Sequence, residues 1–199
     1  MTIKLTNRQE EIIESAGKIM SAKGVSGLTI KNLANEMGFS ESALYRHFKS
    51  KEEIIVTMLD FLADKMNDNF TEATKGKGNA EDKFVSLFKS QFEFFAAQPF
   101  FVTAIFPDSL MDESEKINET IFKVMQVKIK HLMPVIMQGQ QEKIFTDKIT
   151  SEHLIHIVMG SFRLQMFKWR MNKFQFDIKL NGDQMINALL TLIKQHETN

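Results

Sequence analysis

Cysteine is absent from the sequence, and proline and glycine are scarce, with three and nine residues. The absence of cysteine excludes disulfides, thiolate metal sites and cysteine nucleophiles, and it favours a reducing compartment, so we expect a cytoplasmic protein. Net charge is also absent, because 25 basic side chains balance 25 acidic ones. No global field therefore draws the chain toward nucleic acid or anionic lipid, and any such binding must depend on local arrangement.

Long apolar runs are missing as well. No stretch approaches the roughly 20 uninterrupted apolar residues of a membrane span, so we expect no membrane partner. Residues 1–11 are polar and charged. A secretory signal has a basic start followed by an apolar run, so we expect no such signal. The 43% of hydrophobic residues suffices to form a buried core in a chain of 199 residues.

The apolar residues recur at intervals of three and four rather than alternating, which predicts an all-α fold of about nine helices. Residues able to cap helices mark the expected starts in the first part of the chain. These are Thr6 with Gln9, Thr29, Ser40, and Ser50 with Glu53. Gly38 supplies the positive φ of a tight turn between the second and third helices.

Residues 75–79, Lys-Gly-Lys-Gly-Asn, interrupt the helical pattern and form the expected domain boundary. Fourteen of the 18 phenylalanines follow this segment, so a more aromatic core is expected beyond it. Asp112 with Glu115 is expected to begin a long helix that continues to about Gly139. Two further helices are expected at about 151–169 and 183–196, the second beginning at Asp183.

The segment from Gly24 to Lys51 predicts two short helices that meet across a four-residue turn. Their apolar residues, expected to pack together with the first helix, are Leu33, Ala34, Leu44 and Phe48. The third helix then projects Glu41, Ser42, Tyr45 and Arg46. A helix with such an exposed face has the size that the DNA major groove admits.

This segment resembles the helix-turn-helix of the tetracycline-repressor (TetR) family of bacterial regulators. The matching elements are Thr29, Leu33-Ala34, Gly38-Phe39-Ser40, Leu44-Tyr45-Arg46-His47-Phe48 and Lys51. Phe39 stands where the family more often has valine. The resemblance implies a helix-turn-helix DNA-binding domain at 1–50, a connecting helix at 51–74, and a ligand-binding and dimerisation domain at 75–199.

The resemblance also implies roles for the residues that match. Phosphate anchors are expected at Thr29, Tyr45, His47 and Lys51, and contacts to base edges at Glu41, Ser42 and Arg46, with Ser40 beside them. Hydroxyls, imidazole and lysine donate to phosphate, whereas arginine can contact guanine through two hydrogen bonds. The alternatives are structural: Tyr45 as a half-buried core aromatic, His47 as a helix-end residue and Lys51 as a solvated charge.

Members of the family hold a ligand among the later helices and dimerise through the last two, here about 151–169 and 183–196. Gly160-Ser161 would let a partner helix approach closely. An apolar pocket is expected to be lined by Phe88, Phe92, Phe95, Phe101, Phe122, Met125, Phe162 and Met166. The alternative is that these residues are plain core. Arg163, Trp169 and Arg170 would meet an anionic group of the ligand or pair on the surface.

The resemblance implies a dimeric regulator of transcription, expected to be a repressor of a palindromic operator that a small apolar ligand releases. An enzyme is the first rival, but the sequence lacks a glycine-rich phosphate loop, Gly-x-Ser-x-Gly and His-Glu-x-x-His. His153 and His156 have no third ligand at metal-binding spacing, so neither metal nor cofactor is expected. A helical ligand- or protein-binding module with vestigial DNA binding is the second rival, and Tyr45, His47 and Lys51 argue against it.

Overall fold

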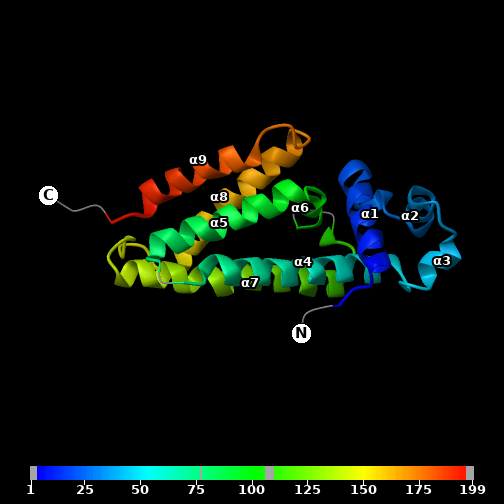
Figure 1. Cartoon of the computed structure of the whole chain (residues 1–199), viewed down its shortest axis with the longest axis horizontal. Helices are drawn as coiled ribbons and strands as arrows, with labels where there is room; N and C mark the ends of the chain where they lie inside the picture. The colour runs from blue at the N-terminus through cyan, green and yellow to red at the C-terminus, as the bar shows by residue number, and fades with distance from the viewer. Residues whose placement is uncertain (1–3, 77, 106–109, 196–199) are drawn as a thin grey trace. The chain divides into compact units, whose positions relative to one another are not determined.

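The computed structural model describes residues 4–76, 78–105 and 110–195, which are helical with no β-strand among them (Figure 1). The all-α prediction is confirmed. The helices are α1 (Asn7–Lys23), η1 (Val25–Gly27), α2 (Ile30–Met37), α3 (Glu41–Tyr45), α4 (Lys51–Thr74), α5 (Ala80–Ala97), α6 (Phe100–Ile105), α7 (Glu115–Gln141), α8 (Ser151–Met171) and α9 (Ile178–Ile193). In the described part of the chain, no helix combines the length and apolar content needed to cross a membrane.

The chain folds as two compact units, and α4 and α7 each contribute residues to both. The first unit contains Met1–Lys65 and Gln98–Met125, and the second contains Met66–Ala97 and Gln126–Asn199. Residues 75–79 separate α4 from α5, yet the packing does not divide the chain there, because α6 packs against α1. Gly17 permits this contact, since a Cβ at this position would lie 2.5 Å from the Phe100 ring.

The helix starts predicted in the first part of the chain follow the local capping pattern. Thr6 and Gln9 form the complete capping box of α1. The Thr29 side chain accepts from the Asn32 amide at 3.0 Å, and that of Ser40 accepts from Ala43 at 3.2 Å.

The predicted box of α4 is only half formed. Ser50 Oγ accepts from the Glu53 amide at 3.1 Å. The Glu53 carboxylate, however, accepts from the amide of Lys49 rather than from that of Ser50.

Two predicted helix starts in the later part of the chain are wrong. The long helix α7 begins at Glu115, because Ser114 Oγ accepts from the Ile117 amide at 3.3 Å, and not at Asp112. The last helix begins at Ile178, where Asp177 accepts from two backbone amides, and not at Asp183. Residue 196, at the expected end of that helix, lies outside the described residues.

Phenylalanine rings from two helices form the centre of the second unit. The ring of Phe162 on α8 lies 6.0, 5.3 and 6.2 Å, between centroids, from those of Phe88, Phe92 and Phe95 on α5. We call these four residues the Phe162 cluster. Helix α9 packs against both α5 and α8.

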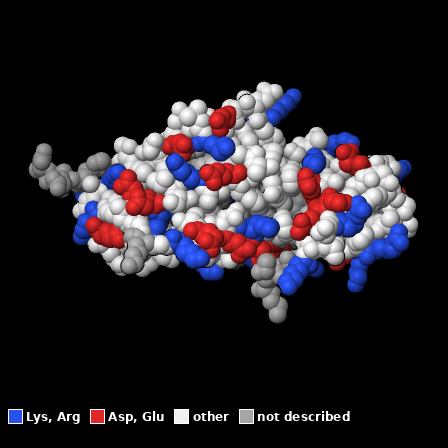
Figure 2. All heavy atoms as spheres, viewed as in Figure 1, with Lys and Arg blue, Asp and Glu red and all other residues white. Residues whose placement is uncertain are grey.

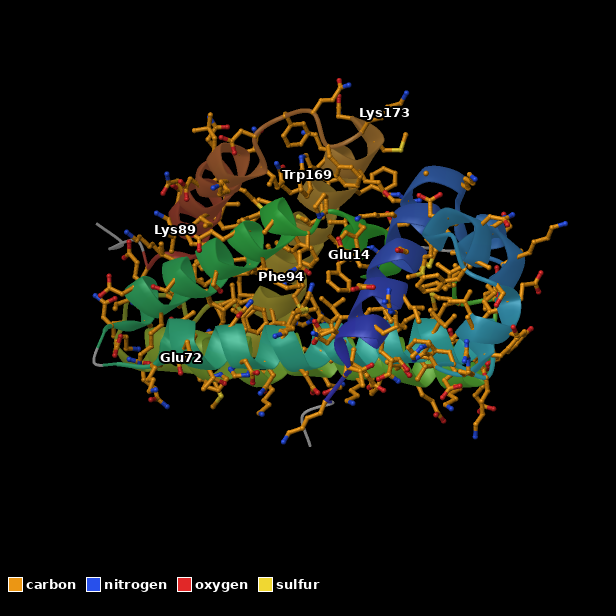
Figure 3. All side chains as sticks on the ribbon, turned by 45° about the vertical axis from the view of Figure 1, so that its right-hand side comes forward. Glu14, Glu72, Lys89, Phe94, Trp169 and Lys173 are labelled. Atoms are coloured by element: carbon orange, nitrogen blue, oxygen red, sulfur yellow. The ribbon has the colours of Figure 1, made fainter. Side chains whose placement is uncertain are left out.

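Trp169 lies against the segment that leads from α8 to α9 (Figure 3). Its Nε1 donates to the Phe176 carbonyl at 2.9 Å, and its ring meets that of Phe174 at 4.8 Å between centroids. Trp169, one of three residues considered for an anionic ligand group, thus has a structural role in this turn.

Candidate functional site

The helix-turn-helix has the buried core that the sequence predicted. Leu33, Ala34, Leu44 and Phe48 are at most 2% exposed. Gly38 takes a left-handed conformation with φ of 67°, and the Phe39 amide then donates to the Ala34 carbonyl at 2.8 Å. These contacts fix the angle between α2 and α3, so the outer face of α3 is held on a defined support.

The side chains expected to meet DNA lie on that outer face. Glu41, Ser42, Tyr45, Arg46 and His47 are all exposed. Tyr45 is 52% exposed, so it is about half buried but is not part of the core, and its exposed half can contact DNA. Figure 2 shows basic side chains projecting from the part of this unit that carries α3, whereas acidic side chains gather over α1. The local charge therefore favours contact with phosphate at α3 although the chain as a whole is neutral.

Thr29 and Ser40 combine helix capping with exposure. Each uses a side-chain oxygen lone pair to accept from a backbone amide, and a hydroxyl can still donate its hydrogen. Ser40 Oγ also lies 2.9 Å from Ser42 Oγ. His47 lies in the turn that ends α3, where its amide donates to the Leu44 carbonyl at 2.9 Å. The helix-end interpretation and the phosphate-contact interpretation of His47 are thus compatible.

Lys51 is held by a partner that the sequence did not indicate. Its Nζ lies 2.9 and 3.0 Å from the two carboxylate oxygens of Glu113, and the two side chains are 27% and 31% exposed. The interpretation of Lys51 as a merely solvated charge is therefore wrong. No local pattern predicts this pair, because it depends on how the segment before α7 packs in the first unit.

Two family models together match most of the chain. The model of "Bacterial regulatory proteins, tetR family" matches residues 12–58, and that of "YsiA-like protein, C-terminal region" matches residues 59–193. The chain belongs to the TetR family. It is a DNA-binding transcriptional regulator and not an enzyme, as the sequence predicted.

Individual TetR relatives are distant in sequence but similar along their whole length. The nucleoid occlusion factor SlmA of Vibrio campbellii (strain ATCC BAA-1116) is 21% identical over 192 residues, which cover 96% of this chain and 98% of that protein. The fatty acid degradation regulator FadR from Bacillus halodurans has a TM-score of 0.85 at 16% identity, covering 98% of this chain and 100% of the other. FadR from Bacillus subtilis in complex with stearoyl-CoA has a TM-score of 0.79 at 17% identity, covering 94% and 100%.

The residues expected to line a ligand pocket do not all come together. Phe88, Phe92, Phe95 and Phe162 form the Phe162 cluster, and Met166 is fully buried on α8. Phe101 belongs to the first unit, where its ring stacks on that of Phe61 at 6.1 Å between centroids.

Phe122 and Met125 are 59% and 43% exposed, so their expected place in a buried pocket is not what the structure shows. The reason is the register of α7, which buries Ile117 and Val124 and turns these two residues outward.

Two polar residues beside the Phe162 cluster escaped the sequence analysis. Lys128 on α7 is 9% exposed, and its Nζ lies 4.6 Å from the centroid of the Phe162 ring. Burial lowers the pKa of Lys128 from 10.5 to about 7. Gln91 on α5 is 3% exposed, and its Nε2 has no hydrogen-bond partner in the described structure. The signal for Lys128 was present, because it follows Val124 and precedes Leu132 by four residues, on the buried face of α7.

The two histidines of α8 that were considered as metal ligands lie on its surface. His153 and His156 are exposed, with ring centroids 6.2 Å apart, and His153 Nδ1 lies 3.0 Å from Thr150 Oγ1. Across the described ranges, no group of three His, Cys, Asp or Glu side chains could hold a metal ion.

Proposed function

We propose that this regulator is a dimeric repressor that binds a palindromic operator through α3 and dissociates when a small apolar ligand binds. The observation that carries the proposal is the exposed face of α3, with Arg46 and Tyr45 projecting from a buried helix-turn-helix core. Arg46 is proposed to contact a base edge, with Glu41 and Ser42 beside it. Thr29, Tyr45, His47 and Lys51 are proposed to contact phosphates, and Ser40 is proposed to contact DNA beside Glu41 and Ser42. Such a repressor acts in the cytoplasm, where bacterial DNA lies.

An exposed apolar seam on α8 supports dimerisation through the last two helices. Its positions alternate in steps of four and three, the spacing of a helix-helix seam. They are Ile157, Gly160, Leu164, Phe167 and Met171. Leu164 and Met171 are 59% and 66% exposed, and a Cβ on Gly160 would meet nothing within 4 Å. Helix α9, which packs against α8, exposes Leu180 and Leu192 by 57% and 68%. Burial of these side chains against a second copy would stabilise a two-fold dimer.

In this proposal, ligand binding releases the operator by changing the distance between the two α3 helices of the dimer. They must lie about 34 Å apart to enter successive major grooves of the operator. Helix α4 belongs to both units, so a ligand that shifts its second part changes the support of α3. The Phe162 cluster supports an apolar ligand, as does the stearoyl-CoA complex of a regulator with this fold. DNA and ligand then weaken each other's binding by the same factor, with a coupling of about 1–3 kcal/mol.

Selection of bound DNA from random duplexes tests the proposal. The wild type is expected to enrich a palindrome. Tyr45→Ala should weaken binding to every duplex, whereas Arg46→Ala should relax the preference at one base position, by about 1–3 kcal/mol. Lys179→Ala, an exposed change on α9, serves as the control. The absence of salt-sensitive retention on any duplex would overturn the proposed operator binding.

A further inference from the structure

Phe39 occupies the position just before the residue that caps α3. Its amide is fixed by the bond to the Ala34 carbonyl at 2.8 Å, and Ser40 follows as the N-cap. A side chain at this position sets the angle at which the chain enters a helix. Helix α3 has only 5 residues, and a helix so short is not stable without its surroundings. The direction of α3 therefore depends on what holds Phe39.

A cation from α1 lies over the Phe39 ring. The Cζ atom of Arg8 is 5.0 Å from the ring centroid, within the distance of about 6 Å at which an aromatic face attracts a cation. Two contacts restrain Arg8 itself. Its backbone lies in the first turn of α1, which the capping box of Thr6 and Gln9 fixes, and its guanidinium pairs with Glu11. The Phe39 ring is thus attached to α1 by a side chain that has little freedom to move.

This contact lies outside the core of the helix-turn-helix. Phe39 is half-buried and the Arg8 side chain is 48% exposed, whereas Leu33 and Leu44 are fully buried. Valine, which the family more often has at position 39, offers no aromatic face to a cation. The contact of Arg8 with Phe39 therefore bears on the orientation of α3 more than on the burial of the core.

We propose that Arg8 is a positioning residue for operator binding, which acts through Phe39 to hold α3 in the orientation that enters the major groove. This inference rests on the proposed contacts between α3 and the operator. Without the contact, α3 samples other orientations, and only the molecules in the competent orientation bind. The apparent affinity then falls by the fraction of molecules that are competent. Operator binding is therefore expected to weaken although every residue proposed to contact DNA is still present.

A double-mutant cycle tests the inference, with affinities for the selected operator measured by fluorescence anisotropy. Phe39→Leu keeps an apolar side chain and removes the aromatic face, and Arg8→Met removes the charge. Each is expected to lower the affinity about two- to fivefold, the equivalent of an exposed contact between a cation and a ring. Because both changes remove the same contact, Arg8→Met should have little further effect in the Phe39→Leu background. Circular dichroism verifies that all variants are folded at the temperature of the measurement.

Two further variants separate positioning from other effects. Phe39→Tyr keeps an aromatic face and should retain the affinity of the wild type. Lys18→Met is the matched control for the loss of charge, because Lys18 is an exposed cation on α1 that also pairs with a glutamate, Glu14. It should change the affinity less than Arg8→Met does.

The outcomes separate this inference from the proposed function. Additive losses in the double variant, or equal losses from Arg8→Met and Lys18→Met, would overturn the positioning role while operator binding by α3 stands. An Arg8→Met loss that persists in Phe39→Leu and lowers the slope of log affinity against log salt by about one would replace positioning by a direct phosphate contact. Failure of the wild type to bind any duplex would overturn operator binding and this inference with it.

Discussion

The ion pair of Lys51 with Glu113 places a carboxylate beside a residue proposed to contact DNA. Both side chains are about one-third exposed, so solvent screens the pair, and its contribution to stability is about 0.2–1 kcal/mol. A DNA phosphate can replace the Glu113 carboxylate as the partner of Lys51, because little stabilisation is lost when the ion pair breaks. If Lys51 contacts DNA as proposed, Glu113 is an internal competitor of the operator for this side chain, and it lies outside the helix-turn-helix.

Removal of the competitor should tighten DNA binding. Glu113→Gln is expected to increase operator affinity by up to about fivefold, the equivalent of the lost ion pair. Lys51→Gln should weaken binding to all sequences and lower the slope of log affinity against log salt by about one. Fluorescence anisotropy with the selected operator measures both. Glu115→Gln, an exposed change close in sequence, is the control, and unchanged affinity in Glu113→Gln would show that the pair does not compete.

Lys128 should make the stability of the protein depend on pH in the neutral and alkaline range. In the unfolded chain its pKa is 10.5, whereas in the folded chain it is about 7. Between these values the unfolded state binds more protons, so the free energy of unfolding rises with pH. The contribution is complete above the unfolded pKa and is lost as pH falls toward 7.

Lys128→Met should therefore stabilise the protein at neutral pH, by on the order of 3 kcal/mol. The difference in the free energy of unfolding between the variant and the wild type should shrink toward higher pH, because the wild type gains stability there. Urea denaturation at about pH 7 and about pH 9 measures the two free energies of unfolding. Lys130→Met, a change of an exposed lysine on the same helix, should retain the wild-type rise. A wild-type value that stays flat between the two conditions would show that Lys128 keeps its ordinary pKa when folded.

At the scale of the helices, local signals were predictable and contacts between distant segments were not. The caps Thr6, Thr29 and Ser40 depend on residues within three positions, so the sequence predicted them. The start of α9 has a local cap too, Asp177, but the prediction placed it at Asp183, next to Gly182, which lies inside the helix. The glycine is there because α5 approaches closely: a Cβ would lie 2.4 Å from the Phe92 ring.

A side chain at Gly182 should force α9 away from α5. Phe92 is 2% exposed and contacts Phe162, so its ring has little room to move. Gly182→Ala is expected to lower the free energy of unfolding by about 1–2 kcal/mol, because the steric cost exceeds the gain in helix propensity. Gln184→Ala, on the exposed side of α9, should leave stability nearly unchanged. Thermal and urea denaturation compare the two, and a stabilised Gly182→Ala variant would contradict the close packing.

At the scale of the whole molecule, the sequence predicted the local elements better than the contacts between segments that are distant along the chain. The TetR motif identified the helix-turn-helix because its caps, turn glycine and core are all local. It did not identify Glu113 or Lys128, since each acquires its role from residues brought near by folding. Phe122 and Met125 failed as pocket residues for a related reason: helical spacing shows that a face is apolar but not whether the fold covers it.

The apolar seam of α8 matters for the proposed operator binding, because a palindrome is bound by two copies of α3 at once, one from each subunit. Leu164→Asp places a charge in the centre of the seam and is expected to yield monomers in analytical ultracentrifugation. A monomer engages one half-site, so operator affinity should fall about a hundredfold or more, and the salt slope should be halved. Met137→Asp is the matched control, because Met137 is 46% exposed on α7, away from the seam. If Leu164→Asp remains dimeric while Met137→Asp dissociates, the subunits pair through α7 instead, and the spacing of the two α3 helices must be set by that helix.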